Sequence, residues 1–163
     1  MKISVATRGG FVPDKYSKYS ETKEAGQPVI SFPIQVENLP TSTQYLALSL
    51  IDYDAVPVAG FPFIHWLAAN IPARDIPEDF SRQFQGPQGK NSWDSRFYDV
   101  DDDYIVSHYA GPMPPEKPHR YTLTVYALSD QLKLANGFYY NGLRDELKGK
   151  ALDSASLDLQ ARN

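Results

Sequence analysis

The sequence contains no cysteine, which excludes disulfide bonds and thiolate metal sites as sources of stability. Cysteine-free chains occur in the reducing cytosol and also among exported proteins, so this absence alone does not give a compartment. The first residues, Met1 to Val5, lead directly to Arg8 without the apolar segment of a signal peptide. We therefore expect a cytoplasmic protein.

The sequence also lacks long apolar runs and an excess of positive charge. No run approaches the length of a membrane span, and the 16 Lys and Arg are scattered and outnumbered by 20 Asp and Glu, which gives a net charge of -4. A nucleic-acid-binding surface needs clustered positive charge to neutralise the phosphates. The composition predicts neither a membrane-spanning protein nor nucleic acid as a partner.

The length of 163 residues is enough for one hydrophobic core and too short for two ordinary domains. We expect a single domain over residues 1–163. No cofactor is predicted for it.

Aromatic residues and turn residues are abundant. The chain has 11 Tyr, 8 Phe and 2 Trp, and 13 Pro and 10 Gly interrupt it at short intervals. This combination favours short strands and many turns over long helices.

Five segments have the composition of strands. The run from Tyr45 to Ile51 is almost continuously apolar, which predicts a strand buried on both faces, and Arg120 to Leu128 alternates most clearly. The full set of expected strands is 2–7, 28–37, 45–51, 61–71 and 120–128.

The remaining segments are expected to be loops and short helices. Residues 13–27 are typical of a surface loop, and residues 73–104 have little periodicity. An irregular segment of that length inside a domain is usually functional or disordered. Apolar residues at helical spacing predict short helices over 141–148 and 150–159. The expected fold class is mostly β.

The histidines and two aspartates are the residues that could carry chemistry. His65 lies within an apolar run, and His119 follows a turn-rich segment, so each imidazole needs a hydrogen-bond partner. Asp52 and Asp54 stand two residues apart after the buried strand, so in extended geometry both would point to one face. If they meet the histidines, the cluster could hold an anion. The alternatives are structural histidines, His108 included, and aspartates that cap their own turn.

The same residues carry a resemblance. Four elements stand in the order found in the phosphatidylethanolamine-binding protein family, also called the Raf kinase inhibitor protein family: Asp52-Tyr53-Asp54-Ala55, His65-Trp66, Gly111-Pro112-Met113-Pro114-Pro115 and His119-Arg120-Tyr121. The similarity extends over roughly residues 28–150. With Asn91-Ser92-Trp93 ahead of the proline-rich element, the chain most resembles the bacterial and archaeal branch.

The resemblance implies a fold and a site. It implies an antiparallel two-sheet, Greek-key-like β fold with short C-terminal helices, and one small cavity. By this resemblance the ligand-binding residues are Asp52, His65, Pro112, His119 and Tyr121, with Asp54 supporting them. The sequence departs from the family pattern where Tyr53 and Val56 replace prolines, and the spacer Glu116-Lys117-Pro118 lacks a glycine.

Other function classes remain open. A hydrolase or a metal-dependent enzyme could use the Asp and His cluster, but the chain lacks His-Glu-x-x-His and Gly-x-Ser-x-Gly motifs. Asp99, Asp101 and Asp103 have calcium-loop spacing, but Tyr104 replaces the required glycine and Ala110 the closing glutamate, which favours a solvated acidic loop. A protein-interaction module and a homodimer are further candidates.

The sequence as a whole favours a binding protein without catalysis and without a metal. The expected partner is a small anionic or phosphorylated ligand, held by His65 and His119, which Asp52 and Asp54 orient. A regulatory role through an unidentified protein partner is also expected from the family analogy. Binding should strengthen as the pH falls toward the histidine range, because a protonated imidazole adds positive charge at the anion.

Overall fold

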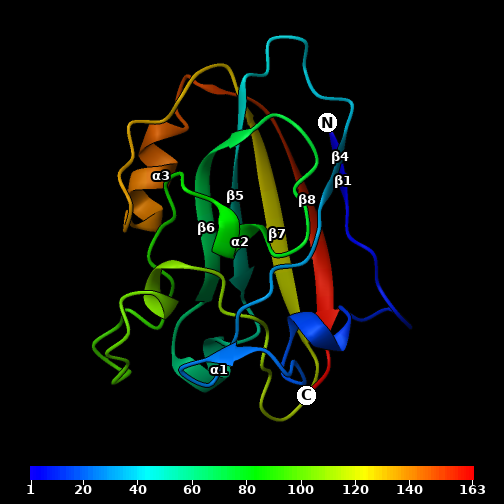
Figure 1. Ribbon diagram of the computed structural model, residues 1–163, viewed down its shortest axis with the longest axis vertical. Helices are drawn as coiled ribbons and strands as arrows, with labels where there is room; N and C mark the ends of the chain where they lie inside the picture. Colours follow the sequence, from blue (N-terminus) through cyan, green and yellow to red (C-terminus); the bar gives the residue numbers. More distant parts are fainter.

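A four-stranded antiparallel sheet forms the centre of the computed structural model, which describes residues 1–163 (Figure 1). Its strand order is β6-β5-β7-β8, so the two central strands come from distant parts of the chain. The bounds are Tyr45–Asp52 for β5, Phe63–Pro72 for β6, His119–Leu128 for β7 and Ala151–Ala161 for β8. The predicted class, mostly β and antiparallel, is confirmed.

Two small antiparallel pairs accompany the main sheet. One pairs β1, Lys2–Ser4, with β4, Gln35–Glu37, and the other pairs β2, Lys23–Glu24, with β3, Gln27–Pro28. Ile3 of β1 packs in the same apolar cluster as Leu48 and Leu159 of the main sheet. The β1–β4 pair therefore covers one face of that sheet.

The helices are few and short. They are α1, Val56–Ala59, α2, Phe80–Gln83, and α3, Tyr140–Glu146, with single 3-10 turns at Asp14–Tyr16 and Ile105–Ser107. The helix predicted over 141–148 corresponds to α3. None of these helices has the length and apolar character needed to cross a bilayer.

Strand β5 is buried on both faces, as its apolar run predicts. Leu46, Leu48 and Leu50 pack into the large cluster on one face, whereas Ala47 packs into a second cluster with Leu143 of α3. Alternate side chains of a strand point to opposite faces, so a central strand covered on both sides needs apolar residues at every position.

The prediction of a helix over 150–159 is wrong, because these residues form strand β8. Ala155, Leu157, Leu159 and Ala161 alternate with polar residues and point toward the core side. The spacing of the apolar residues in this segment agrees with the periodicity of a helix and also with that of a strand. The free edge of β7 decides between them, since it pairs with β8 from His119–Ala161 to Leu128–Ala151.

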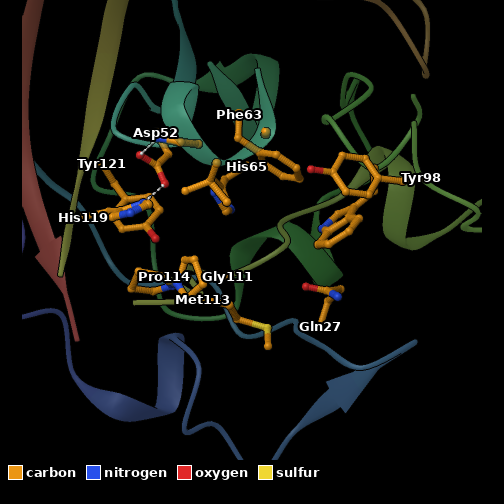
Figure 2. Close-up of a pocket in the computed structure, with 15 residues that line it drawn as sticks. Gln27, Asp52, Phe63, His65, Tyr98, Gly111, Met113, Pro114, His119 and Tyr121 are labelled. Carbon is orange, nitrogen blue, oxygen red and sulfur yellow. Dashed lines mark hydrogen bonds and ion pairs between the residues drawn. The ribbon is translucent and has the colours of Figure 1, made fainter. Parts of the chain in front are cut away.

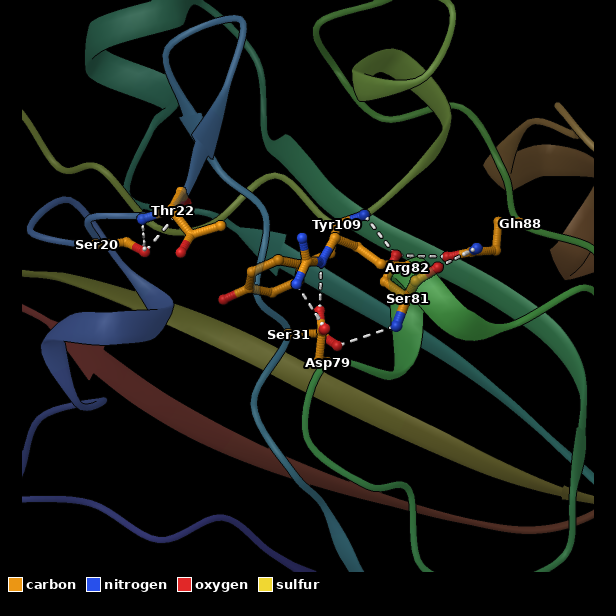
Figure 3. Close-up of polar contacts among 8 residues, drawn as sticks. All are labelled: Ser20, Thr22, Ser31, Asp79, Ser81, Arg82, Gln88 and Tyr109. Carbon is orange, nitrogen blue, oxygen red and sulfur yellow. Dashed lines mark hydrogen bonds and ion pairs between the residues drawn. The ribbon is translucent and has the colours of Figure 1, made fainter.

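The irregular segment 73–104 is held to the sheet by buried polar groups. Gln88 Oε1 accepts hydrogen bonds from Trp66 Nε1 at 2.9 Å and from Ser81 Oγ at 2.7 Å. Ser81 Oγ also accepts the backbone N–H of Tyr109, and Figure 3 shows these contacts of Ser81 with Gln88 and Tyr109. Because buried polar groups need partners, this network fixes how the segment crosses the sheet. The segment therefore reaches the end of the sheet where the candidate site lies.

Candidate functional site

Strand register brings five side chains together at one end of the sheet. Asp52, the last residue of β5, is paired with Phe63 of β6 and with Tyr121 of β7. Residues directly opposite one another share a face, and so do alternate residues of one strand. His65, two residues after Phe63, and His119, two residues before Tyr121, therefore project to the same side (Figure 2).

These side chains line a cavity of about 180 Å³. The turn after β5 and α1 close one side of it, and the loop before β7 closes another. The remaining lining residues are Gln27, Ala55, Val58, Ala59, Trp93, Tyr98, Gly111, Met113, Pro114 and Pro115. At about 30 Å³ per water molecule in the liquid, the space suits a small organic molecule rather than a single ion.

Asp52 and His119 form a buried pair in this cavity. His119 Nδ1 lies 2.8 Å from Asp52 Oδ2, and both side chains are less than 5 % exposed. A carboxylate only accepts, so Nδ1–H is the donor. Asp52 Oδ1 accepts the backbone N–H of Ala55 at 3.0 Å. Asp52 thus caps its own turn and also orients a histidine. The sequence offered these two roles as alternatives, and Asp52 has both.

His65 is held by the backbone instead. Its Nδ1 lies 2.6 Å from the carbonyl oxygen of Ala110, to which Nδ1–H donates, and its ring packs edge-on against Tyr121 with centroids 5.1 Å apart. Burial lowers the pKa of His65 below its usual value of 6.5. His65 is therefore a neutral imidazole near neutral pH, with the lone pair on Nε2.

Tyr121 supplies a phenol beside the pair. Burial raises the pKa of Tyr121, and the negative charge of Asp52 raises it further. The hydroxyl therefore keeps its proton over the physiological range, and it can donate to or accept from a ligand.

The structure places Asp54 outside the cavity, so the expectation that Asp52 and Asp54 share a face is wrong. Asp54 accepts from the backbone N–H of Arg120 at 3.0 Å and from Arg120 Nε and Nη2 at 3.1 and 3.0 Å. These donors lower the pKa of Asp54 to about 2. Strand β5 ends at Asp52, so alternation stops there, and Arg120 points away from the face of His119 and Tyr121. Asp54 supports the site by joining the turn to β7.

Pro112 is buried but is not among the residues that line the cavity. Its neighbours Gly111, Met113 and Pro114 line it instead (Figure 2). The proline-rich loop contributes to the wall, as the resemblance implies, but through different members. In an irregular loop, the turns of the backbone determine which side chains point toward the cavity, and no regular alternation along the sequence predicts it.

An aromatic wall extends from Phe63, the cross-strand neighbour of Asp52, to Tyr98, which lies far from the Asp52–His119 pair (Figure 2). Phe63, Trp93 and Tyr98 pack edge to face, with ring centroids 5.1 Å apart for Phe63 and Trp93 and 4.9 Å for Trp93 and Tyr98. Trp93 and Tyr98 come from the irregular segment 73–104, which therefore forms part of the wall. Asn91 positions the tryptophan, since its Oδ1 accepts the backbone N–H of Trp93.

Sequence reasoning did not place these wall residues in the site. Trp93 stood within the Asn91-Ser92-Trp93 element that carries the resemblance, so a signal for it was present. Gln27 and Tyr98 had none, because Gln27 belongs to the two-residue strand β3 and Tyr98 to an irregular segment, and only the tertiary structure determines where these two segments run.

The charged groups of the cavity are few. Asp52, His65 and His119 are its titratable acids and bases other than tyrosine, and no Lys or Arg lines it. The cavity therefore has no permanently positive side chain on its wall.

The third histidine and the acidic run have structural contacts elsewhere. His108 stacks on Tyr104, with centroids 3.9 Å apart, and its Nδ1–H donates to the carbonyl oxygen of Tyr104 at 2.8 Å. Asp102 Oδ1 accepts the backbone N–H groups of Tyr104 and Ile105 at the start of a 3-10 turn. Within the acidic run, Asp102 thus caps local backbone.

Comparisons with known proteins agree with this architecture. The family model described as phosphatidylethanolamine-binding protein matches residues 2–162. The chain belongs to the phosphatidylethanolamine-binding protein family. The resemblance identified from the four sequence elements is confirmed.

A bacterial relative of this phosphatidylethanolamine-binding family member aligns with nearly the whole chain. "Uncharacterized protein YxkA" of Bacillus subtilis is 46% identical over 158 residues, which cover 93% of this chain and 94% of the relative. This similarity supports membership of the family, and it gives no information about an activity.

Two solved structures of the family share the fold. The putative phosphatidylethanolamine-binding protein homologue CT736 of Chlamydia trachomatis has a TM-score of 0.77 and 23% identity, over 99% of this chain and 96% of that one. YbcL of E. coli, described as a new member of the mammalian family, has a TM-score of 0.74 and 19% identity, over 99% and 98% of the two chains. The phosphatidylethanolamine-binding fold is thus confirmed.

Proposed function

We propose that this protein binds a small anionic or phosphorylated ligand between His65 and His119, and that it does no chemistry on it. One observation carries the proposal. Each imidazole donates through Nδ1 to a fixed protein acceptor, and each Nε2 lacks a hydrogen-bond partner within the protein, on the wall of one cavity. Two such nitrogens converging on a small space are suited to a group with several oxygens.

The protonation states determine which anions fit. In the neutral rings Nε2 is an acceptor, because Nδ1 carries the proton. A fully ionised anion also only accepts, so either a ring or the ligand must bring an additional proton. A phosphate monoester releases its second proton near pH ~6, in the same range as histidine. Binding should therefore strengthen as the pH falls through that range.

The two histidines differ in the group that holds Nδ1–H. The partner of His119 is the carboxylate of Asp52, whereas that of His65 is the neutral carbonyl of Ala110. Burial also lowers the pKa of His65. The proposed roles are thus a donor to the anion at His119 and a neutral group at His65.

The composition of the wall supports binding over catalysis. No Ser, Thr, Cys or Lys lines the cavity, so it offers no aliphatic hydroxyl, thiol or amine as a nucleophile. A phosphate monoester hydrolysed by the protein, with a rate that His119→Ala abolishes, would contradict this part of the proposal.

We also propose that the surface beside the cavity contacts a protein partner or a second copy of this chain. Val58 and Phe97 are 60% and 71% exposed, and Val58 is also a cavity residue. Exposed apolar side chains beside a pocket favour a contact surface. Sedimentation at two protein concentrations measures self-association.

The test is a thermal-shift titration with inorganic phosphate and phosphoethanolamine at pH 6 and pH 8. A ligand that binds the native state alone raises the melting temperature. We expect a rise for the wild type that is larger at pH 6 and is lost in His119→Ala. His108→Ala is the matched control, because His108 lies outside the cavity, and it should respond to both anions like the wild type. No rise with either anion would overturn the proposal.

A further inference from the structure

Two residues that line the cavity each have a buried polar atom without a hydrogen-bond partner. These atoms are Gln27 Oε1 and Trp93 Nε1, and they are the buried side-chain nitrogen and oxygen atoms of the protein that lack one. Both residues line the cavity that contains His65 and His119. Native proteins satisfy nearly all buried polar atoms, so two orphaned atoms in one cavity indicate a missing group.

The two atoms lie at the end of the cavity away from the Asp52–His119 pair. Gln27 stands across the cavity from that pair in Figure 2. Trp93 belongs to the aromatic wall with Phe63 and Tyr98. A molecule bound to His119 would therefore reach Gln27 and Trp93 with its other end.

The chemistry of the two atoms defines that end. The indole Nε1–H only donates, and the amide oxygen only accepts. One group that satisfies both must itself accept and donate, as a hydroxyl or a carboxamide does. An ammonium group cannot accept a hydrogen bond from the indole N–H. An ionised phosphate or carboxylate has no proton to donate to the amide oxygen and would be repelled by its partial negative charge.

We propose that Gln27 Oε1 and Trp93 Nε1 form a second polar subsite, which binds a neutral hydroxyl or carboxamide group of the ligand. The proposal rests on the proposed function for the position of the anionic group at His65 and His119. Neither atom is exposed to solvent, so a neighbouring side chain shifts on binding. Met113 lines the same cavity, and its flexible thioether chain suits such a shift.

Two phosphate monoesters that differ by one hydroxyl test the subsite. Propyl phosphate and 3-hydroxypropyl phosphate have the same chain, and only the second can bond to Gln27 and Trp93. We expect the wild type to bind the hydroxylated ester about tenfold more tightly, which corresponds to two net hydrogen bonds. In Trp93→Phe and in Gln27→Met the ratio of the two dissociation constants should fall toward one. A wild-type ratio of one, or a ratio that persists in both variants, would overturn the subsite.

A second measurement is independent of the histidine end. The protein has two tryptophans, and the Nε1–H of Trp66 is already bonded to Gln88 Oε1 at 2.9 Å. In a ¹H–¹⁵N spectrum, acetamide should move the indole resonance of Trp93 and leave that of Trp66, the internal control, in place. If inorganic phosphate fails to bind, the proposed function fails, and the acetamide titration still decides the subsite: an immobile Trp93 resonance overturns it.

Discussion

His119 Nδ1 donates a hydrogen bond of 2.8 Å to Asp52 Oδ2, across 67 residues of sequence, and both side chains are almost fully buried. The bond fixes the tautomer of His119 and leaves Nε2 without a partner in the protein. Asp52 is held in turn by the backbone N–H of Ala55. The imidazole is therefore orientated before any ligand arrives.

Replacing the carboxylate of this pair should weaken anion binding. Asp52→Asn removes the buried carboxylate that orients the imidazole of His119, so we expect phosphate to bind about tenfold more weakly at pH 6. Calorimetric titration at this pH measures the effect. Asp158→Asn, on the exposed face of β8, is the control, and tighter binding in Asp52→Asn would mean that the carboxylate mainly repels the ligand.

The ligand-free protein should lose stability as the pH falls from 7 to 5. Burial lowers the pKa of His65 below the unfolded value of 6.5, so below that value the unfolded state binds more protons and the free energy of unfolding decreases. His65→Asn should flatten this dependence. His108, whose pKa burial also lowers, contributes in the same direction and is tested by His108→Asn. Urea unfolding at each pH measures the slopes, and an unchanged slope in His65→Asn would contradict the assignment.

Asp54 should contribute to stability at neutral pH and not in strong acid. Its folded pKa of about 2 lies below the usual 3.8, so its contribution is complete above pH 3.8 and disappears as the pH falls through about 2. Asp54→Asn should lower the melting temperature at pH 7 by only about 2 °C, since the side chain of its partner Arg120 is largely exposed. Thermal scans of both proteins should converge near pH 2. Phosphate binding should remain, because Asp54 lies outside the cavity, and its loss would show that the turn itself needs this contact.

Gly111 should not tolerate a side chain. A Cβ there would lie 2.6 Å from the carbonyl oxygen of Tyr16 and 2.8 Å from Pro28 Cβ, so Gly111→Ala must displace the proline-rich loop. We expect a loss of about 2 kcal/mol, typical of overpacking, together with weaker phosphate binding. Gly142→Ala is the matched control, since a Cβ in α3 meets only Leu134 at 3.7 Å and should stabilise the helix by about 0.5 kcal/mol. Chemical unfolding compares the two, and equal stability would show that the loop can move freely.

Gln88 should be a main support of the irregular segment. Gln88→Leu leaves Trp66 Nε1 and Ser81 Oγ without their buried acceptor, so we expect a loss of about 3 kcal/mol. Gln85→Leu, an exposed glutamine of the same segment, should change the free energy of unfolding much less. If the two variants unfold alike, the buried network does not hold the segment.

Much of the fold and part of the site follow from the sequence alone. The strands β5 and β7 are predicted because an uninterrupted apolar run and a clear alternation admit few other structures. Asp52, His65, His119 and Tyr121 are predicted because each belongs to an ordered family element, and all four line one cavity. The single domain, the cytoplasmic location and the ligand stay predictions.

The tertiary structure decided the rest, because the deciding contacts are distant in sequence. Strand β8 exists because the edge of β7 offers it hydrogen bonds, which outweigh the helical spacing of its small apolar residues. Asp54 lies outside the cavity because side-chain alternation ends where β5 ends, and Pro112 lies outside it because its irregular loop has no such alternation. Gln27 of the short strand β3 and Tyr98 of an irregular segment line the cavity through chain paths that depend on packing against the sheet. Local pattern determines which face a residue of a regular strand takes, whereas in a turn or loop only the surrounding contacts determine where a side chain points.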